Sequence, residues 1–139
     1  MRYLIDTNIL IKITNDTDSL SDNVKAIIEN YENIVFVSSA SVTEYTHLLQ
    51  NRKILPNKEL RMLNVFDMIK NKLGFRVKYI AEEHLQTFSK LDPMEGHNDP
   101  NDRLIIAQAM TEKIPMISSD KKIDSVDFQF RSIGEWDWS

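Results

Sequence analysis

Four acidic residues are placed along this chain so that each lies where an apolar segment ends or a helical one begins. They are Asp6, Glu44, Asp102 and Asp120. A carboxylate that directly follows an apolar strand, as Asp6 does, is partly desolvated and needs a partner such as a metal ion or a helix N-terminus. Oxygen ligands without His or Cys select Mg²⁺ or Mn²⁺ over zinc. If these acids hold a metal ion, their chemistry favours Mg²⁺, with Mn²⁺ as a second candidate ion.

Each acid also has a simpler interpretation as a residue that caps a helix. Asp6 could cap the helix that follows it. Glu44 could complete a capping box with Ser41, and local sequence favours that role. Asp99 is a natural N-cap ahead of a proline, and Asp102 then falls in the third helical position. From spacing alone, capping and metal binding remain open for these residues.

The histidines and the polar neighbours of the acids give weaker signals. His47 and His84 have no second histidine at metal-ligand spacing, so we expect surface or packing roles for them. Arg103 is expected to pair with a nearby acid. Ser118 could orient a metal-bound water or bond to the backbone.

Length and composition indicate one cytoplasmic α/β domain covering residues 1–139. A chain of 139 residues with 42% apolar residues can bury one ordinary core. It has no cysteine, which excludes disulfides, thiolate metal sites and a cysteine nucleophile. No apolar run approaches the roughly 20 residues that cross a bilayer. The net charge of −4 argues against nucleic-acid binding unless metal neutralises some of the acids.

Short apolar runs alternate with segments of helical period, which is the pattern of a parallel sheet flanked by helices. Strands are predicted at residues 3–5, 34–37, 75–80, 114–117 and 130–133. Helices are predicted at residues 8–13, 20–31, 41–51, 57–74, 82–91 and 100–112. The second helix is expected to bury Tyr31, and Asn57 is expected to cap the fourth. In such sheets ligands bind at the carboxyl ends of the strands, where Asp6 and Asp120 are predicted to lie.

These motifs, taken in order, resemble the PIN domain family. The matching pieces are Asp6-Thr-Asn after a first strand, Glu44 early in a helix, Asp99-Pro-x-Asp102-Arg103 at the start of an apolar helix, and Ser118-x-Asp120 after a strand. The resemblance covers nearly the whole chain and is closest to the toxins of VapC-type toxin–antitoxin pairs. It implies a three-layer α/β/α sandwich with a parallel sheet of about five strands.

The resemblance also implies a function. It implies an endoribonuclease that hydrolyses RNA phosphodiester bonds with a Mg²⁺-activated water. Asp6, Glu44, Asp102 and Asp120 would form the acidic quartet that holds the metal, with Asp6 and Asp102 as direct ligands. Asn8, Asp99 and Ser118 would support them. The implied partners are an RNA substrate, a small cognate antitoxin and a second copy of the chain.

Basic residues near the predicted site could hold the RNA, although each could equally be a solvated surface residue. They are Lys12, Arg52, Lys53, Lys121 and Lys122. Two alternatives keep the fold: a PIN nuclease of RNA processing, and a non-catalytic PIN-like binding module. A phosphatase of another α/β fold would usually carry Asp-x-Asp after its first strand, where this chain has Asn8.

Overall fold

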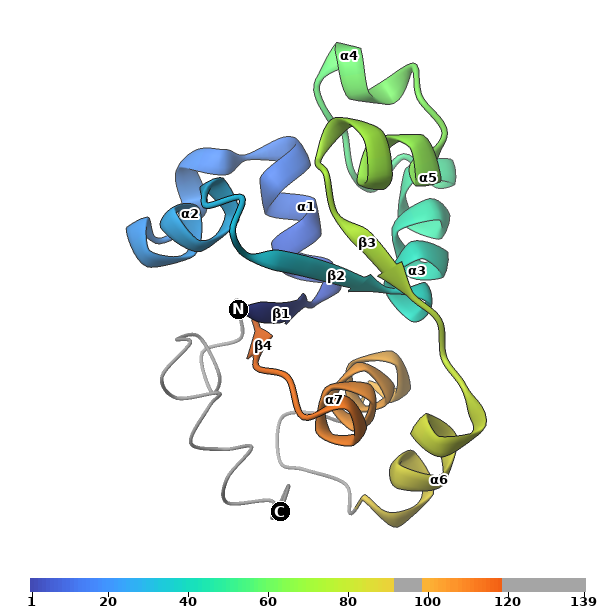
Figure 1. The fold of residues 1–139 in the computed structure, drawn as a ribbon. Coiled ribbons are helices and arrows are strands. Elements are labelled where there is room, and N and C mark those ends of the chain that lie inside the picture. The colour runs from blue at the N-terminus through green and yellow to red at the C-terminus, as the bar shows by residue number, and fades with distance from the viewer. Residues whose placement is uncertain (92–98, 119–139) are drawn as a thin grey trace.

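The sheet has four parallel strands in the order β3-β2-β1-β4 (Figure 1). The computed structural model describes residues 1–91 and 99–118. The strands are β1 (Arg2–Ile5), β2 (Ile34–Ser38), β3 (Arg76–Lys78) and β4 (Met116–Ile117). This confirms the predicted α/β class and four of the predicted strands, while the fifth, at residues 130–133, lies outside the described residues.

Strands β1, β2 and β4 are buried on both faces, and their successive side chains point to opposite sides. Tyr3 and Ile5 of β1 join one core cluster, and Leu4 between them joins the other. Phe36 in β2 lies in the same core cluster as Leu4, whereas its neighbour Val37 lies on the opposite face of the sheet. The continuous apolar runs of the sequence follow from this two-sided burial.

Helices cover the two faces and make three layers (Figure 1). One face carries α1 (Thr7–Asn15), α2 (Asp22–Glu29), α3 (Ser39–Gln50) and the segment of α4 (Lys58–Arg61), α5 (Val65–Asp67) and the π-helical turn η2 (Met68–Lys72). A short 3₁₀ turn, η1 (Thr17–Ser19), joins α1 to α2. The other face carries α7 (Pro100–Glu112), and α6 (Glu82–Lys90) packs against α7. No helix in these described ranges is long and apolar enough to cross a bilayer.

Helix α3 begins earlier than the sequence predicted, and the predicted capping box is wrong. Ser38 is the N-cap, and its hydroxyl accepts the backbone N–H of Ala40 at 3.1 Å. Strand β2 runs directly into the helix, so the serine at the end of the strand caps it before Ser41 can. Ser41 is instead fully buried and accepts a hydrogen bond from the Thr7 hydroxyl at 3.0 Å. Glu44 is thereby free of the capping role.

The predicted helix at residues 57–74 is interrupted. Asn57 caps α4 as expected, and its side chain accepts the N–H of Leu60 at 3.1 Å. Asn64 then caps α5 by accepting the N–H of Asp67 at 2.9 Å. An asparagine that bonds to the backbone in this way competes with a continuous helix. Gly74 follows η2 with φ of +72°, the left-handed conformation that glycine favours.

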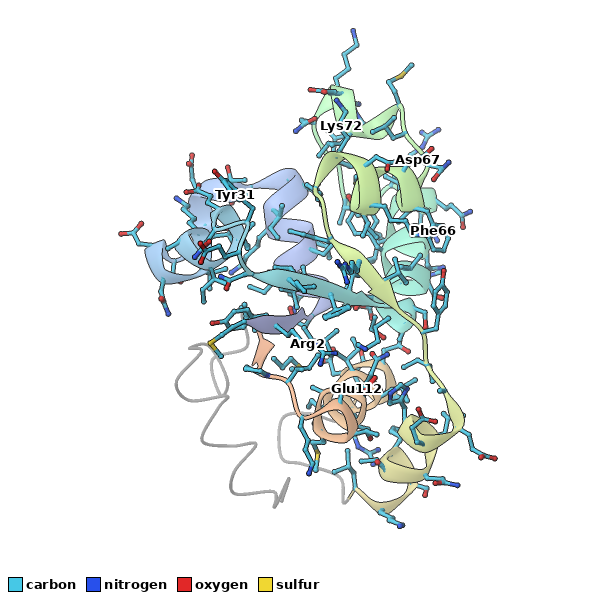
Figure 2. All side chains as sticks on the ribbon, in the orientation of Figure 1. Arg2, Tyr31, Phe66, Asp67, Lys72 and Glu112 are labelled. Carbon is cyan, nitrogen blue, oxygen red and sulfur yellow. The ribbon has the colours of Figure 1, made fainter. Side chains whose placement is uncertain are left out.

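Two further predictions about side chains can be compared with the structure. Tyr31 is 98% exposed rather than buried, because α2 ends at Glu29 and leaves it past the helix (Figure 2). His84 is a packing residue, since it is buried on α6 and its Nδ1 accepts the N–H of Ala81 at 2.9 Å.

Candidate metal centre

The carboxyl ends of three neighbouring strands bring polar residues to one edge of the sheet. Ile5 of β1 pairs with Val37 of β2 and with Ile117 of β4. The next residues therefore lie at the same level: Asp6 and Ser118 follow β1 and β4, and Ser38 is the last residue of β2. In the sheet, β2 lies on one side of β1 and β4 lies on the other. The strand order therefore reverses at β1, and this edge lies at that point. Ligands of open parallel sheets bind at such points.

Asp6 is a buried carboxylate with both oxygens engaged. Only 6% of the residue is exposed. Its Oδ1 accepts the N–H of Ile9 at 2.8 Å, so Asp6 is the N-cap of α1. Its Oδ2 accepts the hydroxyl of Ser118 at 2.5 Å. The capping interpretation of Asp6 is thus confirmed, and the predicted supporting residue Ser118 contacts the acid itself.

A hollow of about 500 Å³ opens beside this edge, between the starts of α1 and α7 and the exposed side of α3. It brings together four of the residues predicted for the site, namely Asn8, Glu44, Asp99 and Asp102. Thr43, His47, Leu48 and Asn101 complete its lining. Residues more than fifty positions apart in the sequence therefore share one hollow.

The amino end of α7 is organised around this hollow. Asp99 is the N-cap, as predicted, and its Oδ1 accepts the N–H of Asn101 at 2.8 Å. The side-chain amide of Asn101 lies 3.4 Å from Glu44 Oε2 and donates to it. Asp102 lies in the first turn of α7 and lines the same hollow. Asn101 therefore links the first turn of α7 to the acid of α3.

The donor set fits a hard divalent cation. The polar lining consists mainly of carboxylate and amide oxygens, which Mg²⁺ prefers, and the chain has no cysteine. The acids surround the hollow without converging on one point: within residues 1–91 and 99–118, no three Asp, Glu, His or Cys side chains could hold an ion by themselves. Mg²⁺ usually keeps several waters and takes only one or two carboxylates, so this spread is compatible with it. The fourth predicted acid, Asp120, lies outside the described residues.

Helix α3 is fixed beneath the hollow by Tyr45, which is fully buried. Its hydroxyl lies 2.8 Å from the hydroxyl of Thr14 in α1 and 3.7 Å from the sulfur of Met68. Burial raises the pKa of Tyr45, so the phenol stays neutral. This contact and the Thr7–Ser41 bond hold α1 and α3 together, and Glu44 is positioned as a result.

A charged pair joins the carboxyl end of helix α7 to strand β3. Lys78 of β3 donates to Glu112 at 3.0 Å, and Gln108 donates to the Lys78 carbonyl at 2.9 Å (Glu112 is labelled in Figure 2). The hydrogen bond from Lys78 holds the pKa of Glu112 below its usual value. Arg103 was expected to pair with an acid; its guanidinium donates to the Leu91 carbonyl at 2.9 Å and lies over the ring of Phe88.

Comparison with known proteins places the chain in a family. The family model for the PIN domain matches residues 3–129, which is most of the sequence. The chain belongs to the PIN domain family. No curated protein matches the sequence.

A solved structure agrees with the PIN fold. A chain in the crystal structure of VapBC2 from Rickettsia felis, bound to a DNA fragment from their promoter, superposes with a TM-score of 0.65. The alignment covers 88% of this chain and 90% of that one, at 20% sequence identity. The predicted PIN-like α/β/α fold is therefore confirmed.

Of the basic residues predicted to bind RNA, the structure describes Lys12, Arg52 and Lys53. Lys12 lines a second hollow of about 250 Å³ together with Ser118 and with Ser19 and Ser21, which precede α2. Arg52 and Lys53 are exposed just past the end of α3. Lys121 and Lys122 lie outside the described residues. RNA binding by these five residues stays a prediction.

Sequence reasoning missed three contributors to the site. Asn101 was passed over although it lies inside the Asp-Pro-x-Asp motif, and its position between two acids was the available signal. The buried Thr7–Ser41 bond had no local signal, because its partners are 34 residues apart. His47 was expected to have only a surface or packing role. It is exposed, yet it also lines the acidic hollow.

Proposed function

We propose that this PIN domain is a metal-dependent endoribonuclease that uses Mg²⁺ or Mn²⁺. The observation that carries the proposal is the hollow that Glu44, Asp99 and Asp102 line together with Asn8, which follows the buried Asp6 by two residues. Clustered carboxylates repel each other unless a cation or a proton intervenes. A divalent cation would relieve that repulsion, and it would also attract an anionic phosphate.

Asp6 and Asp102 are the proposed direct ligands, and Glu44 and Asp120 bind the ion or orient water. When bound, Mg²⁺ supplies Lewis acidity toward the phosphate and lowers the pKa of a coordinated water. In the reaction, water oxygen attacks phosphorus, the P–O3′ bond breaks, and the 3′ oxygen takes a proton. The products carry a 5′-phosphate and a 3′-hydroxyl.

The protein contributes positioning to this reaction. Ser118 donates to one oxygen of Asp6 and fixes the orientation of the carboxylate. Asn101 does the same for Glu44. Asn8 and Asp99 line the same hollow and would hydrogen-bond to waters around the ion. Preorganised groups of this kind accelerate a reaction because they need no rearrangement as charge develops.

We further propose that the biological role is that of a toxin in a type II toxin–antitoxin pair, localised in the cytoplasm. The similar structure is a VapBC2 complex on promoter DNA, and the motif pattern resembles VapC-type toxins. The proposed partners are a small antitoxin protein that covers the acidic hollow and a second copy of the chain. The competing role is RNA processing, and the genomic neighbourhood would separate the two, because a toxin gene adjoins its antitoxin gene.

A non-catalytic PIN-like module remains the alternative with a specific observation behind it. Asp6 and Asp99 both serve as helix caps, a role that requires no chemistry. The capping role does not extend to Glu44, which lies in the second turn of α3 and accepts a bond from Asn101. Helix capping therefore does not explain why Glu44 lines the hollow.

The test is cleavage of labelled structured RNAs by the purified full chain with Mg²⁺, with Mn²⁺ and with EDTA. Glu44→Gln and Asp102→Asn remove one carboxylate each and are expected to reduce cleavage by about 100-fold or more. Asp22→Asn is the matched control, because Asp22 is an exposed acid in the first turn of α2. Cleavage that persists in EDTA, or that survives in both variants, contradicts the proposal.

A further inference from the structure

His47 is the one imidazole that lines the acidic hollow within the described residues. It lies on α3, three residues after Glu44, and the two side chains therefore share a helix face. The remaining wall is made mostly of acids and amides. A substrate strand is anionic, so its approach to such a wall needs hydrogen-bond donors at the rim.

The ring of His47 is held by a neighbour that determines which nitrogen carries the proton. Asn51 Nδ2 lies 3.3 Å from His47 Nδ1 and also donates to the His47 carbonyl at 2.8 Å. A side-chain amide nitrogen only donates, so Nδ1 must accept. In the neutral imidazole the proton then sits on Nε2, which is left as a donor on the ring edge away from Asn51.

Glu44 and His47 are close enough together to contact neighbouring nucleotides of one strand. Residues three apart on a helix advance by about 4.5 Å along its axis, and their Cβ atoms lie about 5–6 Å from each other. If Glu44 lies at the scissile phosphate, the next nucleotide of the strand is within reach of the His47 ring.

We propose that His47 binds the substrate strand, with Nε2–H donating a hydrogen bond to a phosphate oxygen of the nucleotide next to the scissile bond. The inference rests on the proposed nuclease function and adds a substrate-positioning residue to it. His47 does not bind the metal in this proposal, so its removal weakens RNA binding and leaves metal binding intact.

Three substitutions separate hydrogen bonding from ring stacking, which is the other common use of histidine on single-stranded RNA. His47→Ala removes both donor and ring. His47→Gln keeps an N–H donor, and His47→Phe keeps an aromatic ring without one. Gln50→Ala is the control, because Gln50 is exposed on α3 and is not among the residues that line the hollow.

The assay is fluorescence anisotropy of a short labelled single-stranded RNA of mixed sequence, with Ca²⁺ in place of Mg²⁺ to suppress turnover. A charge-assisted hydrogen bond corresponds to about a 10-fold change in Kd. We expect that loss in His47→Ala and His47→Phe, and a change within about 3-fold in His47→Gln. Calorimetry with Mg²⁺ is expected to give the wild-type affinity for all three.

The outcomes distinguish a failure of this inference from a failure of the proposed nuclease function. Wild-type protein that binds metal and cleaves RNA, together with a His47→Ala variant that matches Gln50→Ala, overturns the role of His47 alone. Tight binding by His47→Phe with weak binding by His47→Gln overturns the hydrogen bond in favour of stacking. Loss of Mg²⁺ affinity along with RNA affinity overturns the separation of roles. Wild-type protein that binds neither metal nor RNA overturns both proposals.

Discussion

Asp6 allows the structural and the proposed catalytic roles of one carboxylate to be measured separately. In the structure it accepts two hydrogen bonds, from the N–H of Ile9 and from the hydroxyl of Ser118. Asparagine can keep both, because its Oδ1 still accepts from Ile9 and the Ser118 hydroxyl can rotate to accept from its amide. Asp6→Asn is therefore expected to change the free energy of unfolding by about 1 kcal/mol or less without metal.

Asp6→Ala loses both interactions. The lost N-cap costs about 1 kcal/mol, and the lost hydrogen bond from the Ser118 hydroxyl to a charged carboxylate costs a further 1–3 kcal/mol, roughly. The sum is about 2–4 kcal/mol. Thermal unfolding in EDTA should thus rank the proteins as wild type, then Asp6→Asn close to it, then Asp6→Ala well below.

Metal is expected to separate the stabilities of wild type and Asp6→Asn, which are similar in EDTA. An ion that binds only the folded state adds about 2.7 kcal/mol of stability at 100 times its Kd. Wild-type protein should gain this in Mg²⁺, whereas Asp6→Asn should gain little and should not cleave RNA. An Asp6→Asn variant that is stabilised by Mg²⁺ as strongly as wild type would refute the assignment of Asp6 as a ligand. A large loss of stability in EDTA would instead refute the hydrogen-bond reasoning.

Two further predictions concern the supports of the site. The pKa of Glu112 is lowered from 4.5 by Lys78, so the pair stabilises the fold above about pH 4.5 and loses that contribution as pH falls through the lower, folded-state pKa. Urea unfolding of Glu112→Gln should accordingly show less stability than wild type at pH 7, and the difference should shrink in acid. Tyr45→Phe removes the hydroxyl bonded to Thr14 and should cost about 1 kcal/mol in the same assay, whereas Tyr45→Ala should cost about 3–5 kcal/mol through the cavity it leaves. Equal losses in the two Tyr45 variants would contradict the packing role of the ring.

The local sequence was sufficient to predict the strands and several helix ends. The apolar runs predicted β1, β2 and β4 because a strand buried on both faces needs apolar side chains at successive positions. Asn57 and Asp99 were recognised as caps because an N-cap bonds to the backbone two or three residues later, within reach of local rules. The order of the acids along the chain was sufficient to indicate the resemblance to the PIN domain family.

Local rules failed where two signals competed. Ser38 and Ser41 are both acceptable caps, and the end of β2 decided between them. Asn64 looked like an ordinary helical residue until its bond to Asp67 divided the segment. In both cases the sequence contained the correct residue type, but its neighbours in the chain did not indicate which position would be used.

The candidate site itself depended on tertiary structure. The sequence by itself determined which acids are present, that Asp6 follows a strand and Asp102 lies at the start of a helix, and that their chemistry suits Mg²⁺. Only the parallel register placed Asp6 beside Ser118, which lies 112 residues away, and only the packing of α3 near α7 brought Glu44 within reach of Asn101. The physical reason is that strand pairing and helix packing join segments through long-range contacts, which no spacing within a single segment records.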